Sequence, residues 1–257
     1  MAELVARRAG RAAAVVYPLV LLVFLWWLAT KYWMTNPFTL PSPAATWEAA
    51  RTMIDEGVLQ DAARVTLWRV AVAYLAALAV GVPMGILIGR VPALSRALRP
   101  IVAFFFTAPK SAFYPVMMIV LGLGTSSKIA FGFSLALFQV IIATYAAAAA
   151  VEERFLWSAR SLGTGRVGLF TRVVLPATAP GAVAGARVAL ISAIVGVYLG
   201  EMIAGSDGLG QLMMRARNSL DTPDIYVCIV TICLIAVALD ALMLFASRRA
   251  FHWAEAR

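Results

Sequence analysis

Four ionisable side chains stand inside long apolar runs of the sequence, namely Arg69, Lys110, Glu201 and Asp240. A charge in such a run is costly in lipid, so it has either a partner in the protein or a water-filled path beside it. Lys110 directly follows Pro109, where a helix must break and leave carbonyl groups in need of partners. We therefore expect Lys110 to line a pore or, alternatively, to hold the broken helix together.

The other three charges lie near the ends of their apolar runs. Arg69 is within about one helical turn of an end, and we expect its long side chain to reach the lipid headgroups. We expect Asp240 to form a structural ion pair or a helix cap. Glu201 either lines the mouth of a pore or pairs with Arg215 or Arg217, and the sequence leaves both roles open.

Motifs for catalysis and nucleotide binding are missing from the sequence. It has no G-x-x-x-x-G-K-[S/T] loop, and none of its three lysines, Lys31, Lys110 and Lys128, follows a glycine. Without that loop a chain does not cradle ATP phosphates in the usual way. There is also no HExxH, no GxSxG and no pair of carboxylates within one apolar run. We therefore expect no catalytic residues, metal ligands or cofactor in this chain, which disfavours an intramembrane hydrolase.

Composition places these residues in a membrane protein. Of the 257 residues, 62% are hydrophobic and 14% are charged, whereas soluble domains are about 45–50% apolar and about 25% charged. A single soluble globule is therefore excluded, and so is a disordered chain. The net charge of +9 comes from residues in short loops between apolar runs. Nucleic-acid binding is disfavoured because it needs a basic patch on one solvated face.

Six apolar runs are long enough to cross the hydrocarbon core as helices, which takes about 20 residues each. The expected fold is all-α, with a single transmembrane domain over 1–257 and core spans within 66–246. The third run should be broken at Pro109 and Pro115. The expected spans are Ala12–Thr30, Thr66–Gly89, Ile101–Leu123, Lys128–Ala150, Ala186–Ala204 and Ile225–Ala246.

Lysine and arginine counts predict the orientation of these spans. With the N-terminus inside, the inner segments carry fourteen of these residues and the outer loops carry six. Positive residues are retained on the cytoplasmic side of membrane proteins. We therefore expect both termini, residues 1–11 and 247–257, to be cytoplasmic.

Small residues suggest how the spans pack. Gly81, Gly85 and Gly89 are four residues apart and share one face of the second span, so another helix can approach closely. Pro83 among them predicts a kink. The run Ala146–Ala150 in the fourth span is a second small-residue face. Simple helix packing is the favoured interpretation, and sliding of these smooth faces during a conformational cycle is the alternative.

The inner loop from Val151 to Arg187 is the longest on its side and has helical patterning. Apolar residues recur at helical spacing in two short pieces, which Gly163 and Gly165 separate. We expect two short helices at a sharp angle, with Leu175-Pro176 ending the second and Pro180-Gly181 turning the chain back to the membrane. Such a pair either lies on the lipid surface or docks a cytosolic partner.

This loop resembles the coupling motif of ABC importer permeases, E-A-A, three residues, G, nine residues, then I-x-L-P. Here Trp157-Ser158-Ala159 takes the first three places, Gly163 follows three residues later, and Val173, Leu175 and Pro176 follow nine residues after that. The runs LGLG at 121–124, GEMIAGSDGLGQLM from Gly200, and Asp240 to Arg249 are similar to the nitrate, sulfonate and taurine branch. Trp157 replaces the motif's glutamate, for which Glu152 or Glu153 could substitute.

The resemblance implies a type I permease fold with six spans and a cytoplasmic coupling helix in 151–187. It implies a homodimer with the path at its two-fold interface, two ATP-binding cassette subunits that hold ATP and Mg, and an extracytoplasmic solute-binding protein. The chain itself would be no enzyme but would move a small solute across the cytoplasmic (inner) membrane by alternating access. The residues implied for ATPase docking are Trp157, Ser158, Ala159, Arg160, Leu162, Gly163, Leu175 and Pro176.

An organic or inorganic anion such as sulfonate, taurine or nitrate is the implied solute. Positive groups at Lys110 and Arg69 agree, because they lower the barrier to an anion, although Glu201 has the opposite sign. Other ABC permease substrates, such as a vitamin precursor, a phosphonate or an amino acid, stay open, as does a heterodimer of permeases. A secondary transporter or channel without an ATPase would predict an inverted repeat, and none is visible between the two halves of the sequence.

Overall fold

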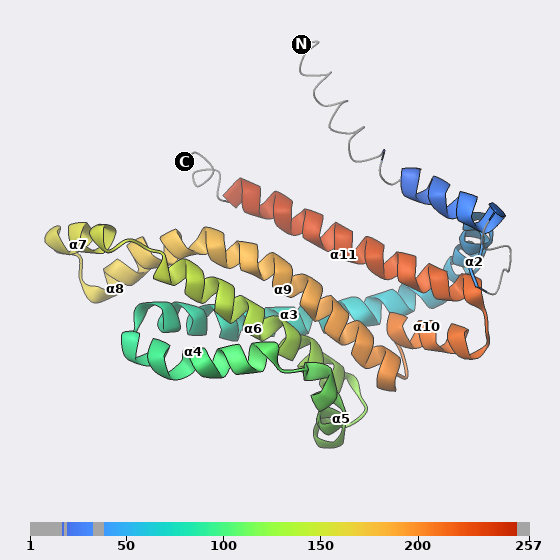
Figure 1. The fold of residues 1–257 in the computed structure, drawn as a ribbon, viewed down its shortest axis with the longest axis horizontal. Coiled ribbons are helices and arrows are strands. Elements are labelled where there is room, and N and C mark those ends of the chain that lie inside the picture. Colours follow the sequence, from blue (N-terminus) through green and yellow to red (C-terminus); the bar gives the residue numbers. More distant parts are fainter. Residues whose placement is uncertain (1–16, 18–19, 33–38, 251–257) are drawn as a thin grey trace, which may run out of the picture. The chain divides into compact units, whose positions relative to one another are not determined.

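A computed structural model describes residue 17, residues 20–32 and residues 39–250, and within these ranges it contains helices and no strand. The all-α fold expected from the sequence is confirmed. The helices are Val20–Tyr32, α2 (Pro43–Asp55), α3 (Val58–Arg90), α4 (Pro92–Thr107), α5 (Lys110–Leu121), α6 (Thr125–Ala149), α7 (Glu153–Ser161), α8 (Arg166–Leu169), the π-helical turn η1 (Phe170–Val174), α9 (Leu175–Ala204), α10 (Leu209–Asn218) and α11 (Thr222–Ala250) (Figure 1).

The chain forms two compact units. The first comprises the described parts of 1–61 together with 212–231, and the second comprises 62–211 with the described part of 232–257. In the first unit the Trp26 indole N–H donates to the Pro41 carbonyl at 3.0 Å and its ring stacks on Tyr226. The residues of the candidate site all belong to the second unit.

Four helices of the described chain are long and apolar enough to cross a membrane: α3, α6, the continuous helical stretch Arg166–Ala204, and α11. The pair α4 and α5 makes a fifth if it is counted as one broken span. The several spans expected are therefore present, but the count of six is not confirmed. The expected first span, Ala12–Thr30, lies partly outside the described residues, and its described part belongs to the apolar helix Val20–Tyr32.

The third expected span breaks at one proline rather than two. α4 and α5 meet at a 92° bend around Pro109, as the sequence indicates. The break expected at Pro115 is wrong, because this residue lies inside α5. A proline in the second turn of a helix removes a single backbone hydrogen bond, and the other bonds of α5 keep the helix together.

The long loop expected between the fourth and fifth spans is also different in the structure. α8, η1 and α9 form one continuous helical stretch, so Leu175-Pro176 ends no helix and Pro180-Gly181 turns no chain. The Leu175 N–H donates to the carbonyl of Phe170, five residues back, which gives a wide π turn. A wide turn just before Pro176 relieves the clash that its ring would have with the preceding carbonyls. The fifth span therefore starts well before Ala186.

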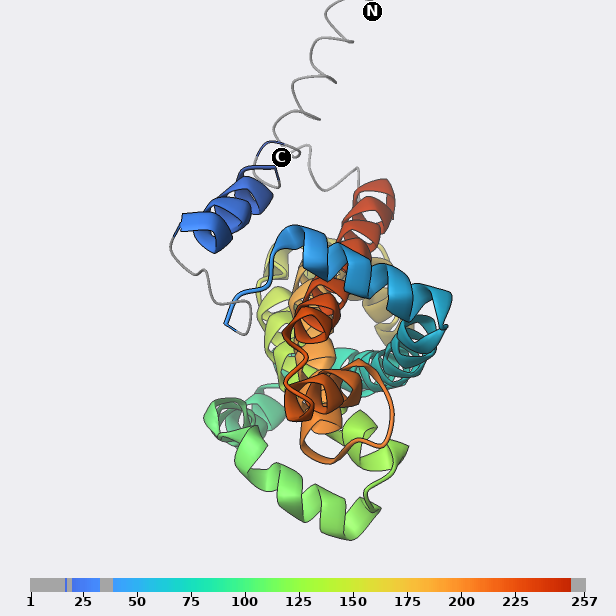
Figure 2. The ribbon, with the colours of Figure 1, turned by 90° about the vertical axis from the view of Figure 1, so that its right-hand side faces the viewer.

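Helices α3, α6 and α9 lie together in the second unit (Figures 1 and 2). Small side chains make up most of the core between them. Gly132 of α6 and Gly196 of α9 face each other so closely that a Cβ on Gly196 would lie 2.7 Å from the Gly132 Cα. The buried residues between the three helices are mainly alanine and valine: Val70, Ala73, Ala77, Ala136, Val140, Ala189, Ala193 and Val197. Backbone contact replaces large side chains here.

The three evenly spaced glycines of α3 lie along α6. A Cβ on Gly81 would lie 2.8 Å from Val140 Cγ1, one on Gly85 would lie 2.6 Å from Thr144 Cβ, and one on Gly89 would lie 2.7 Å from Ala148 Cβ. Their partners are likewise four residues apart. α3 and α6 therefore run close together over three successive contacts, and α3 continues without a break through Pro83.

Candidate functional site

The segment that resembles the coupling motif begins on a short helix, α7, which a tight turn separates from α8. Gly163 closes α7 with φ +78°, a conformation that other residues adopt only with strain. The Thr164 N–H donates back to the carbonyl of Ala159 at 3.1 Å. Of the residues of α7, only Leu156 is buried.

Leu156 is held in a small apolar cluster with one residue from each of two other elements. Its partners are Ile86 of α3 and Val174 of η1, and all three are at most 5% exposed. We call these three residues the Leu156 cluster. The sequence showed Leu156 only as one of several apolar residues at helical spacing, so its special position was missed.

Arg90, the last residue of α3, lies next to this cluster. Its Nη1 donates to the carbonyls of Ala148 and Val151, and its Nη2 is 3.6 Å from the Glu153 carboxylate. Glu152 forms an ion pair with Arg154. Both glutamates that could replace the motif's missing acid are thus paired within the chain.

The residues implied for ATPase docking lie at or near the surface of the described structure. Trp157 and Leu162 are 63% and 86% exposed. Ser158, Arg160 and Gly163 are exposed, and Ala159 is half-buried. Leu175 and Pro176 are exposed on the first turn of α9. The motif therefore falls into two parts, one on α7 and its terminal turn and the other on α9.

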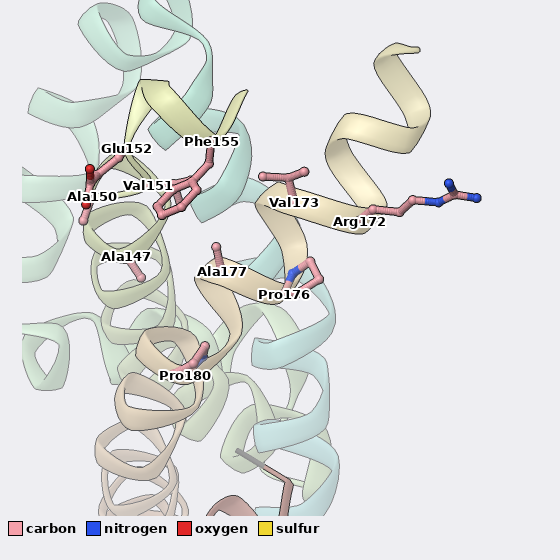
Figure 3. A pocket seen from close by; sticks show the side chains of 10 residues that line it. All are labelled: Ala147, Ala150, Val151, Glu152, Phe155, Arg172, Val173, Pro176, Ala177 and Pro180. Atoms are coloured by element: carbon pink, nitrogen blue, oxygen red, sulfur yellow. The ribbon is translucent and has the colours of Figure 1, made fainter. Parts of the chain in front are cut away.

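A pocket of about 610 Å³ separates the two parts. The end of α6 and the start of α7 form one wall, and η1 with the start of α9 forms the other (Figure 3). Arg172 extends outward at its edge. The lining residues are Ala147, Ala150, Val151, Glu152, Phe155, Arg172, Val173, Pro176, Ala177 and Pro180.

A buried ionic cluster occupies the other end of α3, and here the expectation for Arg69 is wrong. Its side chain is 2% exposed and does not reach toward headgroups. Nη1 bonds the Glu201 carboxylate at 2.8 Å, and Nη2 bonds Asp207 at 2.6 Å and the Thr125 hydroxyl at 3.0 Å. Two carboxylates within hydrogen-bonding distance offset the cost of burying the guanidinium. They take the place of the water that would solvate it at an exposed span end.

Glu201 is wholly buried, so it does not line a pore mouth. Its carboxylate pairs with Arg69, whereas the sequence had suggested Arg215 or Arg217 as its partner. The same carboxylate accepts hydrogen bonds from the Thr66 hydroxyl at 2.8 Å and the Gly210 N–H at 3.1 Å. We call Thr66, Arg69, Thr125, Glu201 and Asp207 the Arg69 cluster.

Glycines let the chain after α9 fold over this carboxylate. Gly208 has φ +93°, and a Cβ there would collide with the Glu201 carboxylate. A Cβ on Gly210 would lie 2.7 Å from the Glu201 Cβ. The glycine-rich run after Gly200 is thus explained by close packing on a buried acid.

Asp207 is the member of the cluster that lies in the connection after α9, and its side chain is 49% exposed. Partial burial by itself would raise its pKa. The hydrogen bond and positive charge of Arg69 outweigh that effect, so the pKa of Asp207 lies below its ordinary value.

Two further groups fix the surroundings of the Arg69 cluster. Lys128, the first residue of the expected fourth span, is wholly buried and donates to the carbonyls of Leu123 and Gly124 at 2.8 and 3.0 Å. The buried Tyr114 hydroxyl of α5 donates to the Gly200 carbonyl at 2.9 Å.

Lys110 and Asp240 lie apart from both clusters. Lys110 donates to the Phe106 carbonyl at 2.9 Å, across the break between α4 and α5, so the structure shows the contact expected if it holds the broken helix together. Asp240 of α11 forms a two-point ion pair with Arg187 of α9 at 3.0 and 2.7 Å. The ion pair expected for Asp240 is present, with a partner on another span.

Comparison with protein families identifies the chain. Residues 81–252 match the model of the binding-protein-dependent transport system inner membrane component family. The chain belongs to this family. The matched region contains the Leu156 cluster, the residues that resemble the coupling motif, and Thr125, Glu201 and Asp207 of the Arg69 cluster.

Two relatives support the assignment along most of the permease. A protein of Brucella abortus (strain 2308) named "Probable ABC transporter permease protein" is 33% identical over 230 residues, which cover 90% of this chain and 91% of the relative. The taurine transport system permease protein TauC of Escherichia coli (strain K12) is 29% identical over 243 residues, covering 91% and 87%.

A solved structure supports the fold. The inward-facing MetNI methionine ABC transporter contains a chain that this permease matches with a TM-score of 0.62 at 22% identity, over 76% of this chain and 95% of that one. The fold is therefore that of a type I ABC importer permease. The protein is a multi-pass inner-membrane permease subunit of an ABC importer for small solutes and is not itself an enzyme, as the sequence indicates.

Proposed function

We propose that this permease forms a homodimer in which each copy docks one ATPase subunit on its coupling segment. ATP and Mg are held by the ATPase subunits, and an extracytoplasmic binding protein delivers the solute. ATP binding moves α7, and the spans then alternate between inward-facing and outward-facing states. Both termini lie in the cytoplasm on this proposal, in agreement with the distribution of arginines.

The observation that carries this proposal is the set of apolar side chains exposed on and after α7. Trp157, Leu162 and Val167 are 63%, 86% and 78% exposed, and exposed polar residues such as Arg154, Ser158 and Arg160 lie between and beside them. Large exposed apolar groups with a polar rim are typical of protein interfaces, and tryptophan and arginine are the residues that most often carry their binding energy.

Charge indicates the chemistry of the partner surface. Between residues 152 and 172 the segment has four arginines and two glutamates, and Arg160 and Arg166 are exposed. An ATPase surface with an apolar pocket and acidic rim would complement it. Trp157 would then replace the charged contact of the usual motif with an apolar one.

The proposed solute is a small organic or inorganic anion, such as a sulfonate, taurine or nitrate. Support comes from TauC, which is named for taurine transport, and from the charge on Lys110. Arg69 no longer adds support, because Glu201 and Asp207 neutralise it. An uncharged solute such as a vitamin precursor is the alternative.

The solute proposal is tested by uptake of taurine and nitrate in cells that express the complete transporter. If Lys110 attracts the anion, Lys110→Met raises the KM for uptake and Lys110→Arg keeps it near that of the wild type. Unchanged kinetics in Lys110→Met would instead restrict Lys110 to holding the α4–α5 break.

The docking proposal is tested by gentle purification of the permease from its native host and mass spectrometry of the proteins that co-elute. We expect a stoichiometric P-loop ATPase with the wild type. Gly163→Val should lose it, because φ +78° strains a β-branched residue. Gly165→Val is the matched control, since its φ is −69° and neither glycine has an atom near its Cβ position.

A permease that came out alone and transported solute without an ATPase would contradict the proposal. The secondary-transporter interpretation would then apply. Binding of α7 to lipid vesicles without any ATPase association would favour the interfacial role for this helix.

A further inference from the structure

We infer that Leu156 is the residue through which movement of α7 reaches the spans, so that it positions the coupling helix without belonging to the docking surface. This inference rests on the proposed docking of an ATPase on α7. It concerns the side of the helix that faces the membrane domain, whereas docking concerns the exposed side.

Leu156 differs sharply in burial from its neighbours in the chain. Phe155 and Trp157 are 38% and 63% exposed, whereas Leu156 is 1% exposed. Its cluster contains one residue of α3, Ile86, and one residue of the π turn before α9, Val174. A single side chain of the coupling helix therefore packs between two different spans.

The polar contacts of α7 are too weak to transmit its movement in place of Leu156. Arg90 and Glu153 are 3.6 Å apart, and the Glu153 side chain is 65% exposed. Exposed ion pairs of this kind contribute little, because water and salt screen them. The pair of Arg154 with Glu152 lies within the segment itself and ties it to no span.

The pocket beside α7 leaves room for the helix to move. Phe155 and Glu152 border this volume of about 610 Å³ on one wall, and Val173 and Pro176 border it on the other. Close-packed interiors transmit displacements, whereas open volume absorbs them. A displacement of α7 is therefore absorbed on the pocket side and transmitted at the Leu156 cluster.

Both receiving residues lie where a small shift has a large consequence. Val174 ends the π turn, where the hydrogen-bond register of the helix changes, and such turns recur at functional sites. Ile86 lies between Gly85 and Gly89, which contact α6 backbone to backbone. A push on Ile86 therefore moves α3 together with α6.

The experiment uses the complete transporter, with its ATPase and binding protein, in proteoliposomes. It measures the taurine or nitrate moved per ATP hydrolysed, whichever of the two the wild type takes up, and the amount of ATPase bound. Leu156→Ala should keep stoichiometric ATPase binding and ATP hydrolysis but lower the transport per ATP by about fivefold or more, the lower range of typical coupling between sites. Leu156→Met, which conserves volume, should restore the ratio.

Phe155→Ala is the matched control, because it truncates a larger side chain at the adjacent position outside the cluster, and we expect a ratio near that of the wild type. Ile86→Ala tests the same path from α3, outside the coupling segment, and should uncouple in the same way.

An unchanged ratio in both Leu156→Ala and Ile86→Ala, with the ATPase still bound, would overturn the inference and leave the proposed docking intact. Loss of the ATPase in Leu156→Ala, with normal coupling in Ile86→Ala, would also overturn it, because Leu156 would then only support the docking surface. Failure of the wild-type permease to bind any ATPase would instead contradict the proposed function.

Discussion

The Arg69 cluster and the Leu156 cluster lie at two ends of the same helices and are built in opposite ways. α3 contributes Arg69 to one and Ile86 to the other, seventeen residues apart, or about 26 Å along a helix. The Arg69 cluster combines charges and directional hydrogen bonds from α3, α6, α9 and the connection after α9. The Leu156 cluster has three apolar side chains beside a pocket.

This difference separates a fixed end from an adjustable end. A buried ion pair tolerates little displacement, because its distances and angles must stay favourable to offset desolvation. The apolar contacts of the Leu156 cluster have no directional bonds to break, so its three residues can move together while staying buried. The spans are therefore held together at the Arg69 cluster and left free to respond at α7.

The largest effect on stability is expected from breaking the fixed end. Glu201→Ala leaves Arg69 buried with only the half-exposed Asp207 as a charged partner, and removing one partner of a buried pair costs about 3–5 kcal/mol. Thermal unfolding in detergent should show a clear fall in Tm. The matched control is Thr125→Ala, which removes a single neutral acceptor of Arg69 and should cost about 1 kcal/mol.

The double variant Arg69→Met with Glu201→Leu sharpens this test. It removes both charges and keeps apolar volume, and such replacements are often neutral for stability. Recovery of Tm in the double variant would show that the loss in Glu201→Ala comes from an uncompensated charge. A cost below about 1 kcal/mol for Glu201→Ala would contradict the view of this cluster as the fixed end.

A smaller effect on stability is expected at the contact between α3 and α6, which lies between the two clusters. Gly85→Val places a Cβ 2.6 Å from Thr144 Cβ and 2.8 Å from the Ile141 carbonyl, so one helix must move, at a cost of about 1–3 kcal/mol. Gly124→Val is the control, because open space surrounds that Cβ position. Both are measured by denaturant unfolding, and equal costs would show that α3 and α6 are not closely held.

The fold was largely predictable from the sequence because its signals are local. Apolar runs predict helices by length alone, Pro109 ends a helix because its ring excludes a hydrogen bond, and glycines four residues apart share a helix face. The π turn was not predictable, since Pro176 normally signals an end and only the wide turn before it removes the clash. Pro115 misled for a similar reason, as one lost hydrogen bond does not break α5.

The partners of the charged residues were not predictable, because they depend on contacts between distant parts of the chain. Arg69 and Glu201 are 132 residues apart in sequence, and nothing near either residue indicates the other. Leu156 was visible only as one apolar residue among several in its segment. Its distinction from Phe155 and Trp157 comes from packing against α3 and η1, which no helical periodicity specifies.

The smallest effect is expected at Asp207, where the fixed end meets solvent. Because Arg69 lowers the folded-state pKa of this carboxyl below the ordinary value of 3.8, its contribution is fully present above about pH 4 and is lost as pH falls through the folded-state pKa. Exposure of 49% limits this contribution to about 1 kcal/mol.

Asp207→Asn keeps the shape and removes the charge, so the Tm difference between wild type and variant should be constant near neutral pH and shrink below about pH 4. Thermal unfolding of both proteins between about pH 7 and pH 3 measures this difference, and acid loss at other carboxylates cancels in the comparison. A difference that stayed constant to the lowest pH would show that Arg69 relies on Glu201 alone, and the fixed end would then contain one ion pair instead of two.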